Sequence, residues 1–328
     1  MEISMTECLD KMSLSRNKVE ELYQQPLLEL VYRAARIHRQ HHDPEEIQCS
    51  SLLSIKTGAC SEDCGYCPQS AHHSTDVERE DLLDIPAVLG AARDAQKNGA
   101  DRFCMGAAWR DVPDGPKFDS ILQMVQGVKG LGLETCMTLG MVRPDQAEQL
   151  KSAGLDYYNH NLDTSREFYS QVVTTRTYDE RLNTLAAIRD SGMRICCGGI
   201  LGMGESEDDR ISLLWELARQ DPPPESVPIN ALIPVAGTPM AEASPLRWDE
   251  LIRAVATARC LMPESVIRLS AGRESMTEEA QAFAFLAGAN SIFLGDRLLT
   301  TSNPAADEER TMLTRLGLVA VSERTQTR

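Results

Sequence analysis

The chain has 328 residues, a length that can bury a large core in one domain or two. Its 49 acidic residues outnumber the 33 basic residues and give a formal charge of −16, which repels nucleic-acid phosphates and anionic lipids. Composition therefore argues against nucleic acid or membrane as a partner and favours a small molecule.

The first residues, MEISMTECLD, have neither the cationic start nor the apolar core of a secretory signal. No apolar run in the sequence approaches the length of a transmembrane helix. Ten cysteines in such a chain are expected to stay reduced for metal binding or catalysis. We therefore expect a cytosolic protein.

The chain is expected to begin with a helical extension at about residues 16–42 and then to alternate strands with helices. The expected strands lie at 51–56, 101–108, 133–140, 156–163, 194–201, 228–235, 266–272 and 291–296. Helical patterns lie between them, for example at 85–100, 120–132, 178–192 and 248–262, and several end in Gly, the usual left-handed helix cap. Eight strand-then-helix units predict a closed parallel (β/α)8 barrel of the TIM type. A doubly wound open sheet is the alternative.

The units are not divided by a linker rich in Pro, Gly or Ser, so we expect a single α/β domain. It should comprise the N-terminal helical extension at 1–49, the barrel at 50–316 and a C-terminal tail at 317–328. The densest proline stretch, DPPPES at 221–226, lies where a helix must stop before a strand.

Three cysteines, Cys60, Cys64 and Cys67, lie close together in the stretch KTGACSEDCGYCPQS at 56–70. A structural zinc site commonly uses four ligands from two separated CxxC pairs, so zinc fits this group poorly. Three thiolates on a four-iron cluster leave one iron open to an external ligand. The spacing CxxxCxxC therefore favours a catalytic cluster, because an electron-transfer cluster is normally fully ligated.

This motif, with Tyr66 directly before its last cysteine, resembles the signature of the radical S-adenosylmethionine superfamily. The resemblance implies that the open iron of a [4Fe–4S] cluster binds S-adenosylmethionine and that one electron cleaves it to a 5′-deoxyadenosyl radical. The motif follows the first expected strand, at the mouth of the barrel, where such folds place their chemistry.

Three more cysteines, Cys104, Cys136 and Cys196, fall inside the second, third and fifth expected strands, and Arg268 falls in the seventh. One such cysteine alone would be read as a small buried hydrophobe. Arg268 alone would be read as an ion-pair or rim charge, because arginine is almost always protonated and has no free lone pair as a cation. Together, the four residues could converge inside the barrel.

The stretches DRFCMGAAWRD, ETCMTLG, YYNHNLDTS, TTRTY, ICCGGILGMGE, VPINAL and RLSAGRE closely resemble the biotin synthase family. The similarity runs from about residue 30 to residue 305. It implies a [2Fe–2S] cluster held by Cys104, Cys136, Cys196 and Arg268, whose sulfide is the sulfur inserted between C6 and C9 of dethiobiotin, in the last step of biotin biosynthesis. Two hydrogen abstractions would use two molecules of S-adenosylmethionine.

One departure from the family pattern is Cys197, which stands where the family more often has a small hydroxyl residue. Adjacent strand residues point to opposite faces, so only one of Cys196 and Cys197 can face the barrel interior. The motif alignment selects Cys196. Cys8, Cys49, Cys197 and Cys260 are left as ordinary thiols.

Asn159, Asn161 and Asp163 occupy alternate positions in YYNHNLD, so on a strand their side chains would share one face. Turn formation is the alternative, because Asn and Asp are favoured in loops. The resemblance implies that Asn159, Asn161 and Asn230 bind the ureido ring of dethiobiotin. It also implies that Asn161 and Asp163 hold the ribose hydroxyls of S-adenosylmethionine.

Other contact residues are expected at the strand ends. Gly202, in the Gly-rich run GGILGMGE, and Ala107, in MGAAW, are expected to let the backbone approach S-adenosylmethionine. Ser302 or Asn303 is expected to cap a helix that begins at Pro304, so the hydroxyls of Thr300 and Thr301 could receive the substrate carboxylate. These threonines could equally be simple capping residues.

Cys104 is expected about 13 Å below the end of its strand, at roughly 3.3 Å per residue, whereas Cys60 lies beyond the end of the first strand. Substrate between them would face the radical on one side and the sulfur donor on the other. The resemblance further implies a homodimer and a flavodoxin-like or ferredoxin-like electron donor. Alternatives are another radical enzyme, such as a hydrogenase maturase, and a metal-storage or electron-transfer protein; the additional cysteine motif of lipoyl synthase is not found.

Overall fold

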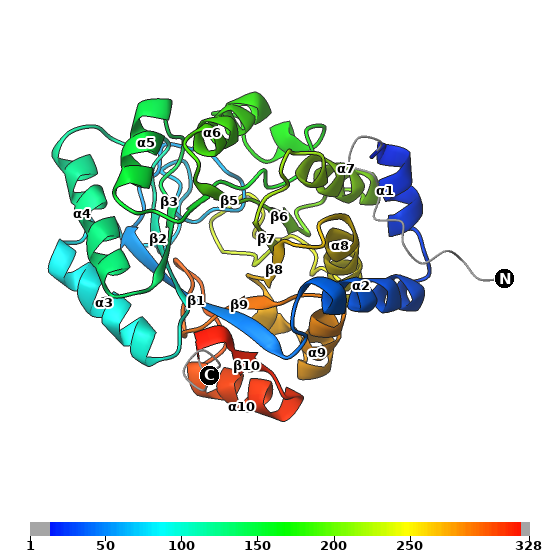
Figure 1. Ribbon diagram of the computed structural model, residues 1–328. Coiled ribbons are helices and arrows are strands. Elements are labelled where there is room, and N and C mark those ends of the chain that lie inside the picture. Colours follow the sequence, from blue (N-terminus) through cyan, green and yellow to red (C-terminus); the bar gives the residue numbers. More distant parts are fainter. Residues whose placement is uncertain (1–13, 323–328) are drawn as a thin grey trace.

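The computed structural model describes residues 14–322 and forms a closed parallel barrel (Figure 1). Its strands are β1 (Glu46–Lys56), β2 (Arg102–Ala107), β3 (Glu134–Thr138), β4 (Tyr157–Asn159), β5 (Arg194–Cys196), β6 (Gly199–Leu201), β7 (Ser226–Ala231), β8 (Val266–Leu269), β9 (Ser291–Phe293) and β10 (Val319–Ala320). Strands β1 to β5 pair in parallel in chain order, β5 and β6 both pair with β7, β7 to β9 continue the order, and β9 pairs with β1 to close the sheet. The barrel is therefore confirmed, and the open-sheet alternative is wrong because it would leave β1 and β9 as unpaired edges.

The helices form a ring outside the strands (Figure 1). They are α1 (Arg16–Tyr23), α2 (Leu27–His41), α3 (Ile85–Lys97), α4 (Pro116–Gly130), α5 (Pro144–Ser152), α6 (Tyr178–Asp190), α7 (Glu207–Ala218), α8 (Trp248–Leu261), α9 (Glu278–Leu286) and α10 (Ala306–Leu316), with short 3-10 helices at Tyr169–Gln171 and Arg273–Ser275. Helices α1 and α2 are the expected N-terminal extension and pack against α7 and α8. Side-chain caps start several helices, for instance Thr177 with Glu180 at α6. None of the described helices is long and apolar enough to cross a membrane.

Strand alternation separates two sets of side chains, one inside the barrel and one beneath the helices. On β2, Phe103 and Met105 belong to the main hydrophobic core, whereas Cys104 belongs to a small separate cluster with Cys136 and Cys196. Because side chains alternate with a period of two, a slip of one residue would exchange the two sets. The register of β2 with its neighbours therefore decides which residues reach the barrel interior.

Most expected strands are shorter in the structure, and the two at 156–163 and 194–201 differ most. The expected strand at 194–201 is divided into β5 and β6, and the expected strand at 156–163 ends at Asn159. The side chain of Asn161 explains the division, since its Oδ1 accepts the Gly198 N–H at 3.1 Å. Gly198 also approaches the next strand so closely that a Cβ would lie 1.9 Å from the Pro228 carbonyl oxygen.

The C-terminal part differs from expectation at two points. Helix α10 begins at Ala306 with Ala305 as its N-cap, so a helix beginning at Pro304 is wrong. Asn303 instead donates to the carbonyls of Phe293 and Gly295, at 3.1 and 2.8 Å. The expected tail contains β10, which pairs with Glu46 and Ile47 at the start of β1.

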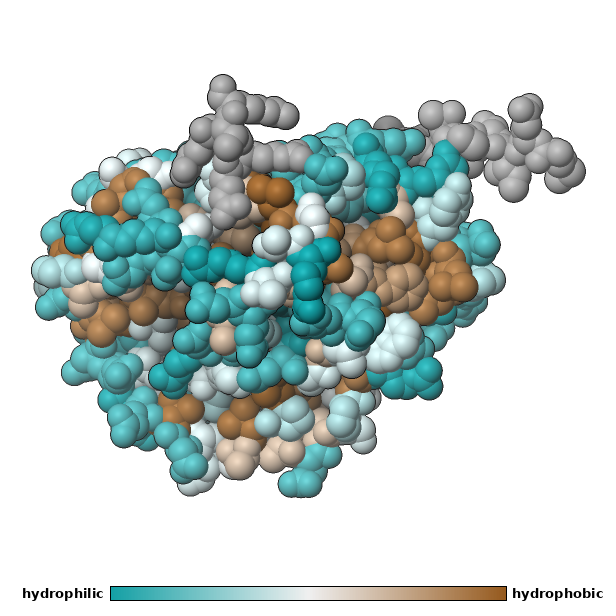
Figure 2. All heavy atoms as spheres, turned by 90° about the horizontal axis from the view of Figure 1, so that it is seen from below, coloured by the Kyte–Doolittle hydropathy of each residue, from teal (hydrophilic) through white to brown (hydrophobic). Residues whose placement is uncertain are grey.

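Figure 2 shows the face of the molecule seen from below, which is largely hydrophilic with separate hydrophobic patches.

Candidate active site

A cavity of about 340 Å³ opens at the carboxyl ends of the barrel strands and contains nearly all the residues expected in a site. Those that line it are Cys60, Cys64, Tyr66, Cys67, Cys104, Ala107, Cys136, Asn159, Asn161, Asp163, Cys196, Asn230, Arg268, Thr300 and Thr301. Its volume is in the range of small-molecule sites. Both cysteine groups therefore face one space.

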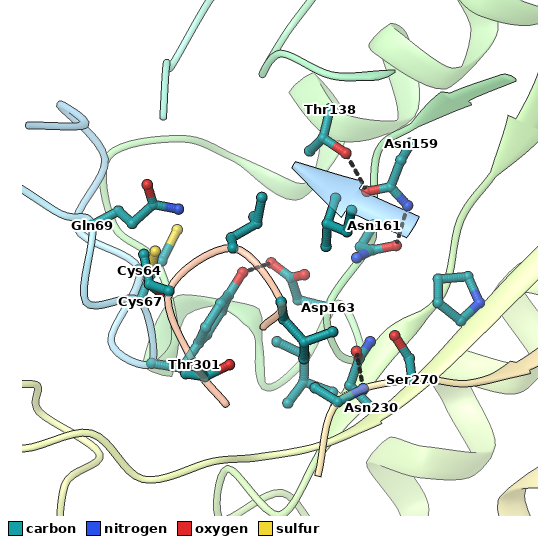
Figure 3. A pocket seen from close by; sticks show the side chains of 18 of the residues that line it. Cys64, Cys67, Gln69, Thr138, Asn159, Asn161, Asp163, Asn230, Ser270 and Thr301 are labelled. Carbon is teal, nitrogen blue, oxygen red and sulfur yellow. Dashed lines mark hydrogen bonds between the residues drawn. The ribbon is translucent and has the colours of Figure 1, made fainter. Parts of the chain in front are cut away.

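The first cysteine group lies on the loop that follows β1. Gly58 and Ala59 have positive φ angles of 70° and 51°, which turn the chain back over the barrel mouth. The Cys67 N–H donates to the Cys64 carbonyl at 2.9 Å, so the last cysteines share one tight turn. Figure 3 shows Cys64 and Cys67 side by side with Gln69 at one end of the pocket. Burial raises the pKa of Cys64 to about 11 and that of Cys67 to about 12.

The second cysteine group lies deeper, on the barrel strands β2, β3 and β5. Cys104 and Cys136 are direct partners in the β2–β3 register. Cys104 is three residues before the end of β2 at Ala107, so it lies about 10 Å below the strand end at ~3.3 Å per residue. Cys196 lies on β5 and shares their cluster, whereas Cys197 faces the main core.

The pKa values of the three deep thiols depend on one another, and Cys136 acts on both of the others. Donation from Cys136 lowers the pKa of Cys104 and lowers that of Cys196 to about 5, although burial opposes both shifts. The charges of Arg268 and Arg102 act in the same direction. Cys136 keeps its proton because the two neighbouring sulfurs raise its pKa.

Arg268 is fixed from below, with 1% of its surface exposed. Its Nε donates to Ser291 Oγ at 3.0 Å, and its Nη2 donates to Ser50 Oγ at 2.9 Å and to Gln48 Oε1 at 3.3 Å. Its guanidinium also stacks over the Phe293 ring, 4.6 Å from the centroid. Among the described hydrogen bonds, Nη1 is left for a ligand in the cavity.

Both groups of residues suit the iron–sulfur clusters that the sequence implies. The upper three thiols face one cavity and are free of disulfides, which matches a cubane whose fourth iron stays open to a ligand. The lower three thiols and Arg268 are buried and line the same cavity. Within residues 14–322 there is no group of three His, Cys, Asp or Glu side chains suited to a single metal ion.

The expected polar row is present but is not built on one strand. Only Asn159 lies on β4; Asn161 follows it, and Asp163 has a positive φ of 68°. Asn159 Oδ1 accepts from Thr138 Oγ1 at 3.1 Å, and Asn159 Nδ2 lies 3.2 Å from both Asn161 Oδ1 and the Cys196 sulfur (Figure 3). The amide row thus touches the deep cysteine group directly.

Asp163 lies between the row and the upper cysteines. Its carboxylate accepts from Tyr66 Oη at 2.9 Å and from Arg181, which also donates to the Asn161 carbonyl. Burial raises the pKa of Tyr66 well above its usual value, so its hydroxyl stays a donor. Tyr66 and Arg181 therefore hold the Asp163 carboxylate in place.

On the opposite wall, Asn230 is held by the backbone. Its Nδ2 donates to the Gly199 carbonyl at 2.9 Å, and its Oδ1 accepts from the Ala271 N–H at 3.1 Å. Each end of an amide keeps further hydrogen-bonding capacity for a ligand. Thr300 and Thr301 lie in the loop before α10 rather than at its N-terminus.

Gly202 is not among the cavity residues. It has a φ of 93°, which suits a tight turn, and a Cβ there would lie 3.2 Å from Leu246. Ile200, two residues earlier, lines the cavity instead. Cys8 lies outside the described residues.

Sequence reasoning missed several polar lining residues, namely Glu62, Gln69, Thr138, His160, Arg176, Arg181 and Ser270. Thr138 is the last residue of β3 and Ser270 directly follows β8, and both lie near the carboxyl end of an expected strand, where barrel folds place their chemistry. The two arginines come from the 172–190 region, which carries no comparable positional signal.

Two family models match the chain: the Radical SAM superfamily at residues 54–215, and the Biotin and Thiamin Synthesis associated domain at 228–319. A biotin synthase of Acidiphilium cryptum is 59% identical over 305 residues, covering 93% of this chain and 94% of the relative. A biotin synthase of Legionella pneumophila is 55% identical over 309 residues, covering 94% and 98%.

Solved structures share the fold at low sequence identity. Methylornithine synthase superposes with a TM-score of 0.78 at 16% identity, over 96% of each chain. HydG, a maturase of the [FeFe]-hydrogenase, gives 0.80 at 15% identity, over 94% of this chain and 72% of that one. These two likenesses concern the fold alone.

Proposed function

Because the chain belongs to the biotin synthase family, we propose that it converts dethiobiotin to biotin by inserting sulfur between C6 and C9, the last step of biotin biosynthesis. One observation carries the proposal. The two cysteine groups face the same cavity at two depths, and an amide row lies against the deeper group. A substrate held by that row would lie between the upper and the deep cysteine groups.

Cys60, Cys64 and Cys67 would hold a [4Fe–4S] cluster, which supplies a hydrogen-abstracting radical when it is bound with S-adenosylmethionine. The deep cysteines and Arg268 would hold a [2Fe–2S] cluster, which would supply the sulfur. The residues of the chain position the reactants. The apolar walls of the cavity, including Leu52, Ile200 and Phe293, limit the access of water to the reacting centre.

The amides suit a cyclic urea, since each offers a donor and an acceptor. Asn159, Asn161 and Asn230 are proposed to hold the ureido ring. Asp163 and Asn161 are proposed to hold the ribose hydroxyls of S-adenosylmethionine, because a carboxylate accepts from two hydroxyls at once. Tyr66 and Ala107 would contact the same cofactor.

The substrate carboxylate is assigned to Thr300 and Thr301, whose hydroxyls lie at the cavity wall. They precede α10, so the attraction expected from a helix N-terminus does not reach them directly. Their contribution is therefore hydroxyl donation to a charged carboxylate, worth about 1.5–3 kcal/mol for each bond.

The test is anaerobic turnover of the full chain. The protein is reconstituted with iron and sulfide, supplied with dethiobiotin, S-adenosylmethionine and reductant, and assayed for biotin and 5′-deoxyadenosine by mass spectrometry. We expect about two deoxyadenosines for each biotin. Deoxyadenosine without biotin would point to another substrate, and neither product from a fully loaded protein would refute the assignment.

Two proposals concern partners. The family resemblance favours a homodimer, which light scattering after size-exclusion chromatography would reveal as twice the mass of 36.2 kDa. It also favours a flavodoxin-like or ferredoxin-like electron donor. Replacing the chemical reductant with each reduced donor should sustain biotin formation with one of them.

A further inference from the structure

The side chain of Arg176 reaches the upper cysteine group from the segment between the 3-10 helix at Tyr169–Gln171 and α6. It is 8% exposed and lines the cavity. Its Nη2 donates to the Cys64 sulfur at 3.9 Å, and its Nε lies 3.9 Å from Glu62 Oε1. Neither the sequence motif nor the proposed substrate contacts give this buried cation a role.

The upper thiols also lie near groups that favour their charged forms. Burial raises the pKa of Cys60, and the backbone N–H of Glu62 partly offsets this effect. Burial likewise raises the pKa of Cys67, and the backbone N–H of Gln69 partly offsets it. For Cys64 the largest opposing effect comes from the Arg176 guanidinium, which also donates to its sulfur. Of these groups, the arginine is the one that a substitution can remove.

The acidic residues inside the cysteine motif hold the segment that carries this arginine. Glu62 is 3% exposed, accepts from Arg110 at 3.0 Å and also pairs with the Thr175 hydroxyl. Asp63 accepts the N–H groups of Thr174 and Thr175 at 2.9 and 3.1 Å. The cysteine loop and the segment before α6 are therefore fastened together, and this fixes the guanidinium at the sulfur.

We propose that Arg176 is a positioning residue that hydrogen-bonds to the Cys64 thiolate and raises the reduction potential of the [4Fe–4S] cluster. The inference rests on the proposed function. Reduction adds one negative charge to the cluster, and a nearby cation with a hydrogen bond to sulfur stabilises the reduced form. Arg176 thereby eases delivery of the electron on which the chemistry depends.

The test is a redox titration of the full-length, reconstituted protein, followed by the EPR signal of the reduced [4Fe–4S] cluster. Arg176→Met should shift the midpoint potential to a more negative value at unchanged iron and sulfide content. Arg176→Lys keeps the positive charge but lacks the planar guanidinium, so its midpoint potential should lie between those of the wild type and Arg176→Met. Arg166→Met is the matched control, because Arg166 is exposed and pairs with Asp179 at the surface, and it should leave the potential unchanged.

A second variant keeps the test decisive where Arg176→Met loses its cluster. Arg176→Gln keeps a neutral N–H donor at this position, removes the charge and should also shift the potential to a more negative value. Wild-type potentials in the loaded Arg176→Lys and Arg176→Gln proteins would overturn the inference while leaving the proposed function intact. A wild-type protein that holds no cluster would overturn both.

Discussion

Cys196 and Cys197 are chemically identical neighbours with opposite surroundings. Cys196 faces the deep cysteine group and Cys197 faces the core beneath the helices. We expect Cys196→Ala to remove the absorbance of the second cluster and to abolish biotin formation, because one ligand is lost. Cleavage of S-adenosylmethionine should continue, because the upper group is untouched.

Cys197→Ala is the matched control for that substitution. It should keep both clusters and lower the stability by about 1 kcal/mol through a small core cavity. If Cys197→Ala lost the second cluster and Cys196→Ala kept it, the assignment of the ligand would be reversed. Cys136→Ala should behave as Cys196→Ala does.

Thr138 orients the amide that we assign to the substrate. Its hydroxyl donates to Asn159 Oδ1 at 3.1 Å, so Thr138→Val keeps the shape and removes the bond. We expect about 1 kcal/mol weaker binding of dethiobiotin, or about a fivefold higher dissociation constant in calorimetry. Binding of S-adenosylmethionine serves as the internal control and should stay constant; an equal loss for both ligands would contradict the assignment.

At the scale of single residues, local spacing was most informative where the chemistry itself is local. Cys60, Cys64 and Cys67 could be read directly as one ligand group. The alternation of strand residues showed that one of Cys196 and Cys197 faces inward, but the choice between them came from the family resemblance. Arg176 could not be predicted, because it meets the cysteine loop only through the folding of distant segments.

At the scale of elements, the junction of α2, α8 and α9 depends on one buried cation. Arg259 has no exposed surface and donates to the carbonyls of Ser265 and Gly288 at 2.7 and 2.9 Å. A Cβ at Gly288 would lie 2.6 Å from its side chain, so glycine is needed there. His38 lies beside this cation on α2.

Stability should fall as the pH drops below about 6.5, because His38 is buried in its neutral form. Burial and then the charge of Arg259, opposed only by Asp43 among the main causes, lower the pKa of His38 to about 3. Between these pH values, His38 is therefore protonated in the unfolded state but not in the folded state. The free energy of unfolding falls by about 2 kcal/mol from this residue by pH 5. Urea unfolding at pH 7 and pH 5 measures it.

His38→Gln should flatten that pH dependence, although it changes stability at pH 7 as well. His41→Gln is the control, since His41 is exposed on the same helix turn, and it should leave the difference between the two pH values as in the wild type. An unchanged difference in His38→Gln would show that other groups carry the effect.

Most elements followed from local patterns, whereas interruptions did not. The strand-then-helix alternation predicted the barrel order correctly. The division of the strand at 194–201 was missed because the Asn161 side chain takes the Gly198 N–H, a contact across strands. The start of α10 was missed because Asn303, a good capping residue, caps other carbonyls instead.

At the scale of the whole molecule, the residues after α10 return to the barrel and pair with the start of β1. Val319 and Ala320 pair with β1, and the Val319 N–H donates to the Glu45 carbonyl at 2.8 Å. Val319→Pro removes this donor and should lower the free energy of unfolding by about 1–3 kcal/mol. Val319→Ala keeps the donor and should cost less; equal effects in urea unfolding would show that the strand pairing contributes nothing.

The overall fold was accessible because each unit repeats one simple pattern, and the closure of the barrel followed from the count of units. The tail was expected to be an appendage, since two residues are too few to predict as a strand. The residues that line the cavity could be predicted only in part. Which side chains face inward depends on the register between strands that are far apart in the sequence.

The two cysteine groups differ in contact order, with a consequence for biogenesis. Cys60, Cys64 and Cys67 lie within eight positions, so a nascent or partly unfolded chain already presents them together. The deep group takes one residue from each of β2, β3, β5 and β8 and exists only after these strands have joined. We therefore expect ordered maturation, in which the upper cysteines are available to iron early and the deep group is filled through the open mouth of a finished barrel.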